Sequence, residues 1–230
     1  MKTKTIQALV LILSLLQLSQ SLTLTGTVRD FKISHPDFED FNGVNLGIVK
    51  DELGADKKPV YNGGVTTTGA ANFNQWYNDV DGINLSTPFS IELTDPDSDG
   101  IYTYTNNAFF PIDNMLFENE GNAHNYHFTF ELHTKFTYEA GQTFSFTGDD
   151  DLWVFINDHL EIDLGGVHGA MTASVDLDTL GLTPGNTYSL DLFFAERHTF
   201  ASNFQIETSI ELITDPCAVV RAVRKMAKRM

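Results

Sequence analysis

Residues Gln142 to Asp163 constrain the fold of this chain more strongly than any other stretch. Polar and apolar residues alternate over 143–147, residues 152–156 are all apolar, and Leu160 and Ile162 again alternate with polar residues. Short runs of this kind, separated by turn-forming residues, are typical of β-strands. The stretch therefore predicts three consecutive short strands.

Three successive aspartates, Asp149 to Asp151, stand between the first two of these strands. Carboxylates that crowd one end of a sheet are unfavourable unless a cation or solvent relieves the charge. Ca²⁺ accepts carboxylate and carbonyl oxygens in flexible geometry, so one interpretation is a calcium loop at the rim of a β-sandwich. The other is an acidic, solvated turn, because Asp and Gly are common turn residues.

The same segment resembles the core of the protective-antigen domain (PA-fourteen), a β-sandwich shared by yeast adhesins and glycosidase inserts. In that family a strand ends in a paired Asp-Asp, a short strand follows, and the next strand closes in Ile-Asp. Asp149-Asp150, residues 152–156 and Ile162-Asp163 occupy these places. The family usually has Gly after the acidic pair, whereas this chain has Asp151, which puts the loop conformation in question. The resemblance implies that Asp149 and Asp150 are the central ligands of a Ca²⁺ ion.

A second resemblance, to the fibro-slime domain family, covers nearly the whole chain, from about Leu24 to Ile213. That family includes secreted slime-mould proteins and contains a protective-antigen-type core. Several motifs in order carry the resemblance, and together they are more specific than any one of them. They are Arg29-Asp30-Phe31, His35-Pro36-Asp37-Phe38-Glu39, Lys58-Pro59-Val60-Tyr61, the segment from Phe73 to Asn84, Phe109-Phe110-Pro111-Ile112-Asp113, and the segment from Phe193 to Thr199.

The expected fold class is all-β, an antiparallel, jelly-roll-like β-sandwich with one short helix and long loops. Leu190, Leu192 and Phe194 alternate with Asp191 and Phe193, and a similar alternation runs over 204–211, which predicts two further strands. Phe73, Trp76, Tyr77 and Val80 recur at spacings of three and four, which predicts a short helix within 70–80.

The first 21 residues are typical of a secretory signal peptide. Lys2 and Lys4 precede an apolar run from Ile6 to Leu18, and small residues follow. The run is short for a membrane span, although an uncleaved segment would act as an anchor. The expected organisation is a signal peptide (1–21), one β-sandwich domain (22–214) and a basic tail (215–230), and the expected location is extracellular or at the cell surface.

The lone cysteine, Cys217, lies in the tail, so the domain cannot form a disulfide within itself. Two interpretations remain open for it. One is a disulfide to another chain, and the other is that a further cysteine-rich module begins there.

The charge of the predicted domain restricts its partners. Of the 14 Lys and Arg residues, two lie in the signal and five in the last ten residues, which leaves seven against 31 acidic residues and a net charge of −24 over 22–216. Nucleic acid and anionic lipid both require cations on the protein, so neither is an expected partner. Strong acidity fits calcium, neutral glycans or a cationic surface, and it also favours solubility outside the cell.

The segment 195–203 precedes the last predicted strand. In adhesins of the protective-antigen type this loop completes the calcium site and shapes the sugar pocket. The resemblance therefore implies that Asn203 gives an oxygen to the ion and that Arg197, His198 or Phe200 meets a ligand. The alternative is a structural ion pair, with Glu196 or with the aspartates.

Glycines surround His168 in the sequence Gly165-Gly166-Val167-His168-Gly169. They indicate a loop with unusual backbone angles or a close approach to another segment. We favour a structural role for this loop. In the binding interpretation, His168 contacts a ligand beside the acidic rim.

Three further motifs for metal binding or glycosylation are less specific. Asp95 to Gly100 begins like an EF-hand loop, but Asn106 stands where a bidentate Glu belongs, which leaves a β-hairpin turn or a weak calcium site of another type. His127 and His133 lie about 20 Å apart along one predicted strand, too far to share a metal ion, so zinc is not supported. Asn84-Leu85-Ser86 is an N-glycosylation sequon.

The sequence thus favours a secreted, non-catalytic, adhesion-like module for calcium-assisted recognition of extracellular carbohydrate or matrix. The alternative is a structural or signalling matrix protein in which calcium serves only rigidity. Hydrolysis is disfavoured, because a retaining glycosidase needs two carboxylates about 5 Å apart and the adjacent Asp149 and Asp150 are better committed to an ion. The sequence also has no Gly-x-Ser-x-Gly nucleophile motif.

Overall fold

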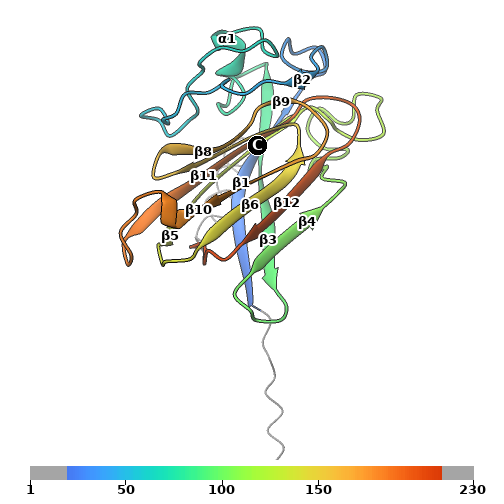
Figure 1. Cartoon of the computed structure of the whole chain (residues 1–230). Helices are drawn as coiled ribbons and strands as arrows, with labels where there is room; N and C mark the ends of the chain where they lie inside the picture. The colour runs from blue at the N-terminus through green and yellow to red at the C-terminus, as the bar shows by residue number, and fades with distance from the viewer. Residues whose placement is uncertain (1–19, 214–230) are drawn as a thin grey trace, which may run out of the picture.

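Antiparallel strands form the framework of residues 20–213, which the computed structural model describes (Figure 1). The expected all-β antiparallel sandwich is confirmed. Every strand ladder among these residues is antiparallel, and the largest sheet has the order β10-β6-β12-β4-β3-β1-β5-β11-β7-β8. The strands are β1 (Gln20–Phe31), β2 (Gly43–Val44), β3 (Asn84–Asp95), β4 (Tyr102–Asn106), β5 (Phe128–Thr137), β6 (Thr143–Asp149), β7 (Asp151–Ile156), β8 (His159–Leu164), β9 (Gly166–Val167), β10 (Met171–Asp176), β11 (Thr187–Glu196) and β12 (Asn203–Thr208).

The three strands predicted within 142–163 are β6, β7 and β8. Asn157 and Asp158 form the two-residue turn between β7 and β8, and both have positive φ angles, of 52° and 71°. Two-residue hairpins favour such angles because the turn then matches the twist of the strands. β6 and β7 follow each other in the chain but do not pair. β6 pairs with β10 and β12, whereas β7 pairs with β8 and β11.

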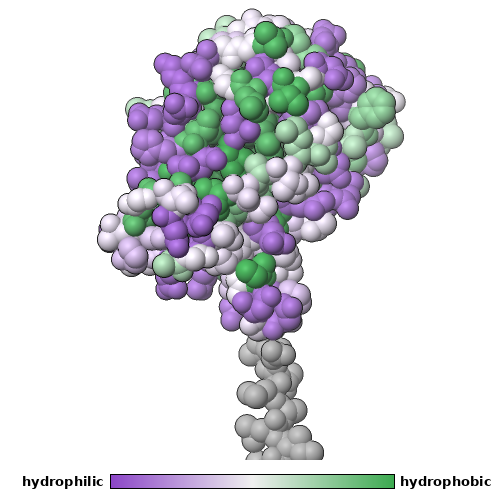
Figure 2. Space-filling model, in the orientation of Figure 1, coloured by the Kyte–Doolittle hydropathy of each residue, from purple (hydrophilic) through white to green (hydrophobic). Residues whose placement is uncertain are grey.

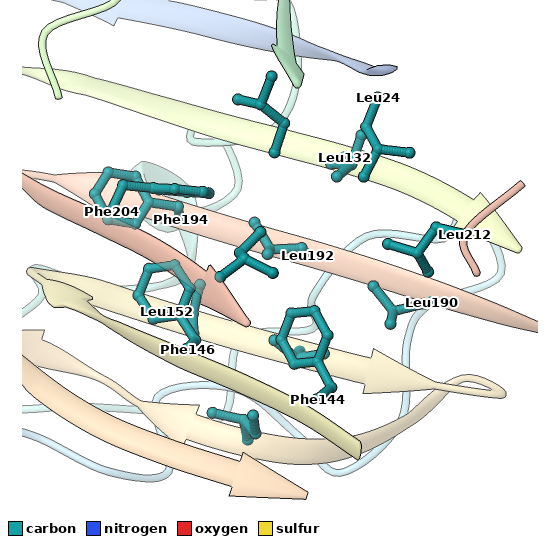
Figure 3. Packing of buried hydrophobic residues seen from close by; sticks show 14 of the residues in the cluster. Leu24, Leu132, Phe144, Phe146, Leu152, Leu190, Leu192, Phe194, Phe204 and Leu212 are labelled. Atoms are coloured by element: carbon teal, nitrogen blue, oxygen red, sulfur yellow. The ribbon is translucent and has the colours of Figure 1, made fainter. Parts of the chain in front are cut away.

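The core lies between the β10-β6-β12-β4 strands and the β5-β11-β7-β8 strands, which the long β1–β3 pair connects. Phe109 stacks on Phe204 with 4.5 Å between ring centroids, and Phe194 and Phe146 contact Phe204 edge-on. Figure 3 shows Phe146, Phe194 and Phe204 gathered in the core. The strands predicted over 190–194 and 204–211 are β11 and β12, although β12 ends at Thr208. Leu190, Leu192 and Phe194 of β11 face this core.

A second apolar cluster lies on the outer face of β7 and β11. Residues between 31 and 77 pack there against Trp153, Phe155 and Phe193 (Figure 1). The helix expected within 70–80 is shorter than predicted, because α1 spans only Ala70–Phe73 and the chain then continues in turns. Asn72, Asn74 and Asn78 favour turns over helix, and the side chain of Asn78 bonds to the carbonyl of Asn74.

Three connections cross between the two layers at one end of the sandwich. They are the step from β6 to β7 at Asp149–Asp151, the segment from β8 through β9 to β10, and the loop from β11 to β12. The Asp149–Asp150 peptide bond is cis. These crossings bring the acidic run, the glycine loop and the segment 196–203 together.

The predicted signal peptide lies outside the described residues except for Gln20 and Ser21, which begin β1. The basic tail with Cys217 also lies outside them. Within residues 20–213, no helix has the length and apolar character needed to cross a membrane.

Candidate functional site

Asp149 ends β6 and is held by the first residue of β12. Its Oδ1 accepts a hydrogen bond from the Asn203 backbone N at 2.6 Å, and its Oδ2 accepts one from Asn203 Nδ2 at 2.8 Å. The side chain is buried, and burial raises its pKa. Asp149 and Asn203, both predicted as ligands of a Ca²⁺ ion, thus lie in direct contact through the backbone and side-chain nitrogens of Asn203.

Asp150 occupies the crossing point itself. Its two carboxylate oxygens accept hydrogen bonds from backbone nitrogens of the other two crossing segments, His168 N at 3.0 Å and Arg197 N at 3.1 Å. The carboxyl is buried, and this burial together with the neighbouring Asp151 raises its pKa to about 7. Asp150 thus joins all three crossing segments.

Asp151 forms an ion pair with Arg197, and neither side chain is exposed. The same guanidinium donates to the Thr66 carbonyl at 2.6 Å and lies over the Trp76 ring at 4.9 Å. Of the two roles considered for Arg197, the structure shows the structural ion pair with an aspartate. The prediction that Arg197 meets a ligand is corrected, because every part of its side chain is enclosed by protein.

Glu196 is an acidic residue that the sequence analysis considered only as an ion-pair partner of Arg197, which pairs instead with Asp151. It is completely buried at the end of β11, where its Oε1 accepts a hydrogen bond from His198 N at 3.3 Å and its Oε2 has no partner among the described residues. Burial, and then the charge of Asp150, raise its pKa well above the usual value. The sequence did contain a signal that the Glu196 side chain points inward. Alternation along β11 gives Glu196 the same orientation as the core residue Phe194.

Negative charge is in excess at this end of the sandwich. Arg197 is paired with Asp151, whereas Asp149, Asp150 and Glu196 have no cationic side chain in ion-pair contact within residues 20–213. Burying carboxylates without compensation is costly, and the raised pKa values of all three express that cost.

A pocket of about 300 Å³ opens onto Asp149 and Asp150. His168, His198 and Phe200 line it, so three predicted ligand residues surround the predicted metal residues. The Phe200 ring is 85% exposed and stacks beside His198 with 5.9 Å between centroids. The His168 ring is fixed by contacts with the carbonyls of Leu164 and Gly169.

The glycine loop has the structural role that we favoured. Gly166 has a φ of +109°, and a Cβ at this position would lie 2.4 Å from Asn45 N and from Gly43 O. Its own N donates to Asp151 Oδ1 at 2.6 Å. The glycine permits β9 to pair closely with β2, which fixes the backbone that carries His168.

The weaker signals do not join this pocket. Asp95 to Gly100 forms the β3–β4 turn, where the Asp95 carboxylate accepts bonds from the backbone nitrogens of Asp99 and Gly100. Asp95, Asp97 and Asp99 have ligand atoms within 4.8 Å of one another. His133 pairs with Asp191 at 2.7 Å. Asn84 of the sequon is buried, and its amide donates to the carbonyls of Gln75 and Asn78.

The family profile of the PA14 domain, the protective-antigen-type domain, matches residues 97–215 and so includes both the acidic pair and the loop before β12. The chain belongs to the PA14 domain family. The protective-antigen resemblance is thereby confirmed, and the fibro-slime resemblance agrees with the slime-mould relatives described next.

Curated relatives of this PA14 chain come from Dictyostelium discoideum. Protein psiQ is 43% identical over 210 residues, covering 83% of this chain and 21% of the relative, and protein psiC is 38% identical over 236 residues, covering 92% and 46%. The chain therefore spans less than half the length of these relatives.

Two solved structures are similar at low identity. The PA14 domain of the MpAFP antifreeze protein is 12% identical with a TM-score of 0.35, covering 86% of each chain. A PA14 sugar-binding domain from an RTX adhesin is 11% identical with a TM-score of 0.36, covering 83% of this chain and 95% of the other.

Proposed function

We propose that this PA14 domain is a secreted, non-catalytic module that recognises extracellular carbohydrate or matrix glycan with the help of a bound Ca²⁺ ion. The observation that carries the proposal is the pair of buried carboxylates, Asp149 and Asp150, which line an open pocket and form no ion pair with a cationic side chain of residues 20–213. PA14 domains as a class are binding and adhesion modules, which agrees with this assignment.

Calcium suits the chemistry of the pocket. Asp149, Asp150 and Asn203 offer hard oxygen donors, and a divalent cation would offset the excess negative charge that burial makes unfavourable. When bound, Ca²⁺ also supplies open coordination positions for two adjacent hydroxyl oxygens of a sugar. Glu196 would contribute negative charge from behind the pocket.

The exposed wall of the pocket suits a sugar ring. Phe200 presents an aromatic face next to His198, and aromatic faces pack well against the apolar face of a pyranose because both surfaces are flat and only partly polar. His168 and His198 supply polar groups at the pocket margin. Selectivity among sugars would therefore depend on the 198–201 and 168–169 segments.

A hydrolytic role receives no support from the geometry. Asp149 and Asp150 each accept two hydrogen bonds from the protein, and these bonds hold the carboxylates in fixed positions. Arg197, which lies next to these carboxylates in the structure, is enclosed with Asp151. The residues therefore fit an ion-binding role better than a pair of catalytic carboxylates.

The decisive experiment is thermal unfolding of the full-length chain with millimolar Ca²⁺ or with EDTA. Calcium at about 100 times its dissociation constant should stabilise the wild type by about 2.7 kcal/mol, and the Asp149→Asn, Asp150→Asn variant should gain nothing. The Asp97→Asn, Asp99→Asn variant is the matched control, because it removes two carboxylates from the acidic β3–β4 turn. If the control loses the calcium effect and the pocket variant keeps it, the metal binds at the turn and the proposal fails.

A glycan array in calcium tests the recognition step. Phe200→Ala should leave unfolding unchanged, because the ring is exposed, and should weaken binding of any glycan that the wild type retains. A wild type that binds calcium but no glycan would favour the matrix-structural alternative. The exposed apolar residues Val44, Leu46 and Val65 support that alternative. Figure 2 shows apolar side chains on the surface at the end of the molecule where α1 and β2 lie in Figure 1.

A further inference from the structure

A hollow of about 720 Å³ lies on the outer face of the β5–β11 pair and shares no lining residue with the calcium pocket proposed above. It forms where the second apolar cluster ends, so that the outward residues of both strands are polar from this point on. The residues that matter here are His133, Lys135, Asn157, Ser189 and Asp191, with the Lys57–Asp158 ion pair at the edge.

The register between β5 and β11 places their outward polar residues side by side, and these residues form the polar wall of the hollow. His133 stands directly opposite Asp191, and Lys135 stands opposite Ser189. Alternation along a strand gives all four the same outward orientation. The Lys57 ammonium donates to Asp158 at the β7–β8 turn, which ties the overlying loop to the edge of the hollow.

Asp191 is the unusual member of the set. It is only 4% exposed, and its Oδ1 lies 2.7 Å from His133 Nδ1. Its Oδ2 is buried and has no hydrogen-bond partner among the described residues. A buried carboxylate oxygen without a donor is unfavourable, and a water or ligand molecule that supplies the donor is one explanation for such an atom.

We propose that this hollow is a second, calcium-independent binding site for one or two units of a saccharide. The hollow has the volume of a typical small-molecule site, about 300–1,000 Å³. Sugar hydroxyls both donate and accept, so they suit a wall that combines a carboxylate acceptor with the Lys135 ammonium, the Ser189 hydroxyl and the Asn157 amide. An anionic ligand fits less well, because Asp56, Asp158 and Asp191 all line the hollow.

The test is a ¹H–¹⁵N NMR titration of the full-length chain in EDTA with methyl α-D-mannopyranoside, methyl β-D-galactopyranoside and the methyl glycoside of N-acetylglucosamine. At least one glycoside should shift the backbone amides around His133, Ser189 and Asn157 in a saturable way. Because EDTA removes calcium, this result is independent of the acidic pocket, and the Asp149→Asn, Asp150→Asn variant should bind equally well.

Two variants localise the effect. Asp191→Asn should weaken binding at least tenfold by removing the charged acceptor, and Ser189→Tyr should abolish binding by filling the hollow while leaving Asp191 and His133 in place. Ser145→Tyr, at an outward and half-buried position of β6, is the matched control and should bind as the wild type. The proposal is overturned if no glycoside shifts these amides, since solvent then satisfies Asp191, or if the shifts persist in Ser189→Tyr.

Discussion

Arg197 donates two hydrogen bonds to Asp151, from Nε to Oδ2 at 2.6 Å and from Nη2 to Oδ1 at 3.1 Å, and neither side chain is exposed to solvent. Asp151 lies just after the acidic pair and Arg197 lies in the loop before β12. The ion pair therefore fastens the two segments that carry the proposed calcium ligands and the wall of the pocket. It links stability to function without contact with a ligand.

Removing one member of this pair should be strongly destabilising. Asp151→Asn leaves the Arg197 guanidinium buried without a counter-charge, which typically costs about 3–5 kcal/mol. Urea denaturation monitored by tryptophan fluorescence measures the loss. Arg197→Lys should also be destabilising, because a single ammonium cannot reproduce the bidentate bonds.

The Lys57–Asp158 pair provides the control. Both of its side chains are about half exposed, so Lys57→Met should leave the unfolding midpoint unchanged within error. Equal effects of Lys57→Met and Asp151→Asn would contradict the structural role that we assign to Arg197.

A second prediction concerns the backbone that carries His168. Gly166→Ala should destabilise the protein by at least about 1–3 kcal/mol, because φ is +109° and the new Cβ would meet the backbone of Asn45 and Gly43. Gly169→Ala lies three residues away with no atom near its Cβ, and it should change stability by less than about 0.5 kcal/mol. Denaturant midpoints of the two variants decide the matter, and similar values would show that β9 does not need the glycine.

The sequence predicted the features that depend on local pattern. Alternation and turn chemistry located β6, β7 and β8. Family resemblance placed His198 and Phe200 beside the acidic pair, and the surrounding glycines suggested the same place for His168 only in the interpretation that we did not favour. These features follow from residues that are neighbours in the chain or from motifs of fixed spacing.

Contacts between distant segments could be offered only as alternatives, as with the ion pair of Arg197 to Glu196 or to the aspartates. Asp151 and Arg197 are 46 residues apart, and only the crossing of the chain between layers brings them together. The same crossing completes the burial of Glu196, because alternation along β11 indicates only its inward orientation and the crossing segments enclose it. The predicted helix was too long because apolar spacing of three and four also fits successive turns that point Phe73 and Trp76 into one cluster.

Stability should fall as pH rises from about 4 to about 7, and Asp30 should account for part of the fall. Burial raises the pKa of Asp30 from 3.8 to about 7, although bonds from Asn125 and Phe117 partly oppose this. Between these two pKa values the folded state keeps a proton that the unfolded state has lost, so folding takes up a proton and weakens as pH rises. Above about pH 7 the contribution becomes constant. Three pKa units correspond to roughly 4 kcal/mol for a single group.

Urea denaturation in EDTA between pH 4 and pH 8 measures this slope. Asp30→Asn cannot titrate, so its free energy of unfolding should vary less over the same range than that of the wild type. Asp150 and Glu196 also have raised pKa values and should leave a residual slope in the variant. Identical slopes in the two proteins would mean that Asp30 titrates normally in the folded state.

The sequon at Asn84 should remain unmodified in the folded protein. The amide of Asn84 donates to the carbonyls of Gln75 and Asn78, and its Oδ1 accepts a bond from Val80 N at 3.1 Å. An N-linked glycan would replace one amide proton and require space at a position that is only 6% exposed. Intact-mass spectrometry of the chain secreted from a eukaryotic host should therefore show no glycan at this residue.

Asn84→Gln has the same chemical groups on a longer side chain and should be destabilising, which separates a structural asparagine from a glycan acceptor. A folded fraction that carries a glycan at Asn84 would show that the 75–84 turn can open without loss of the sandwich.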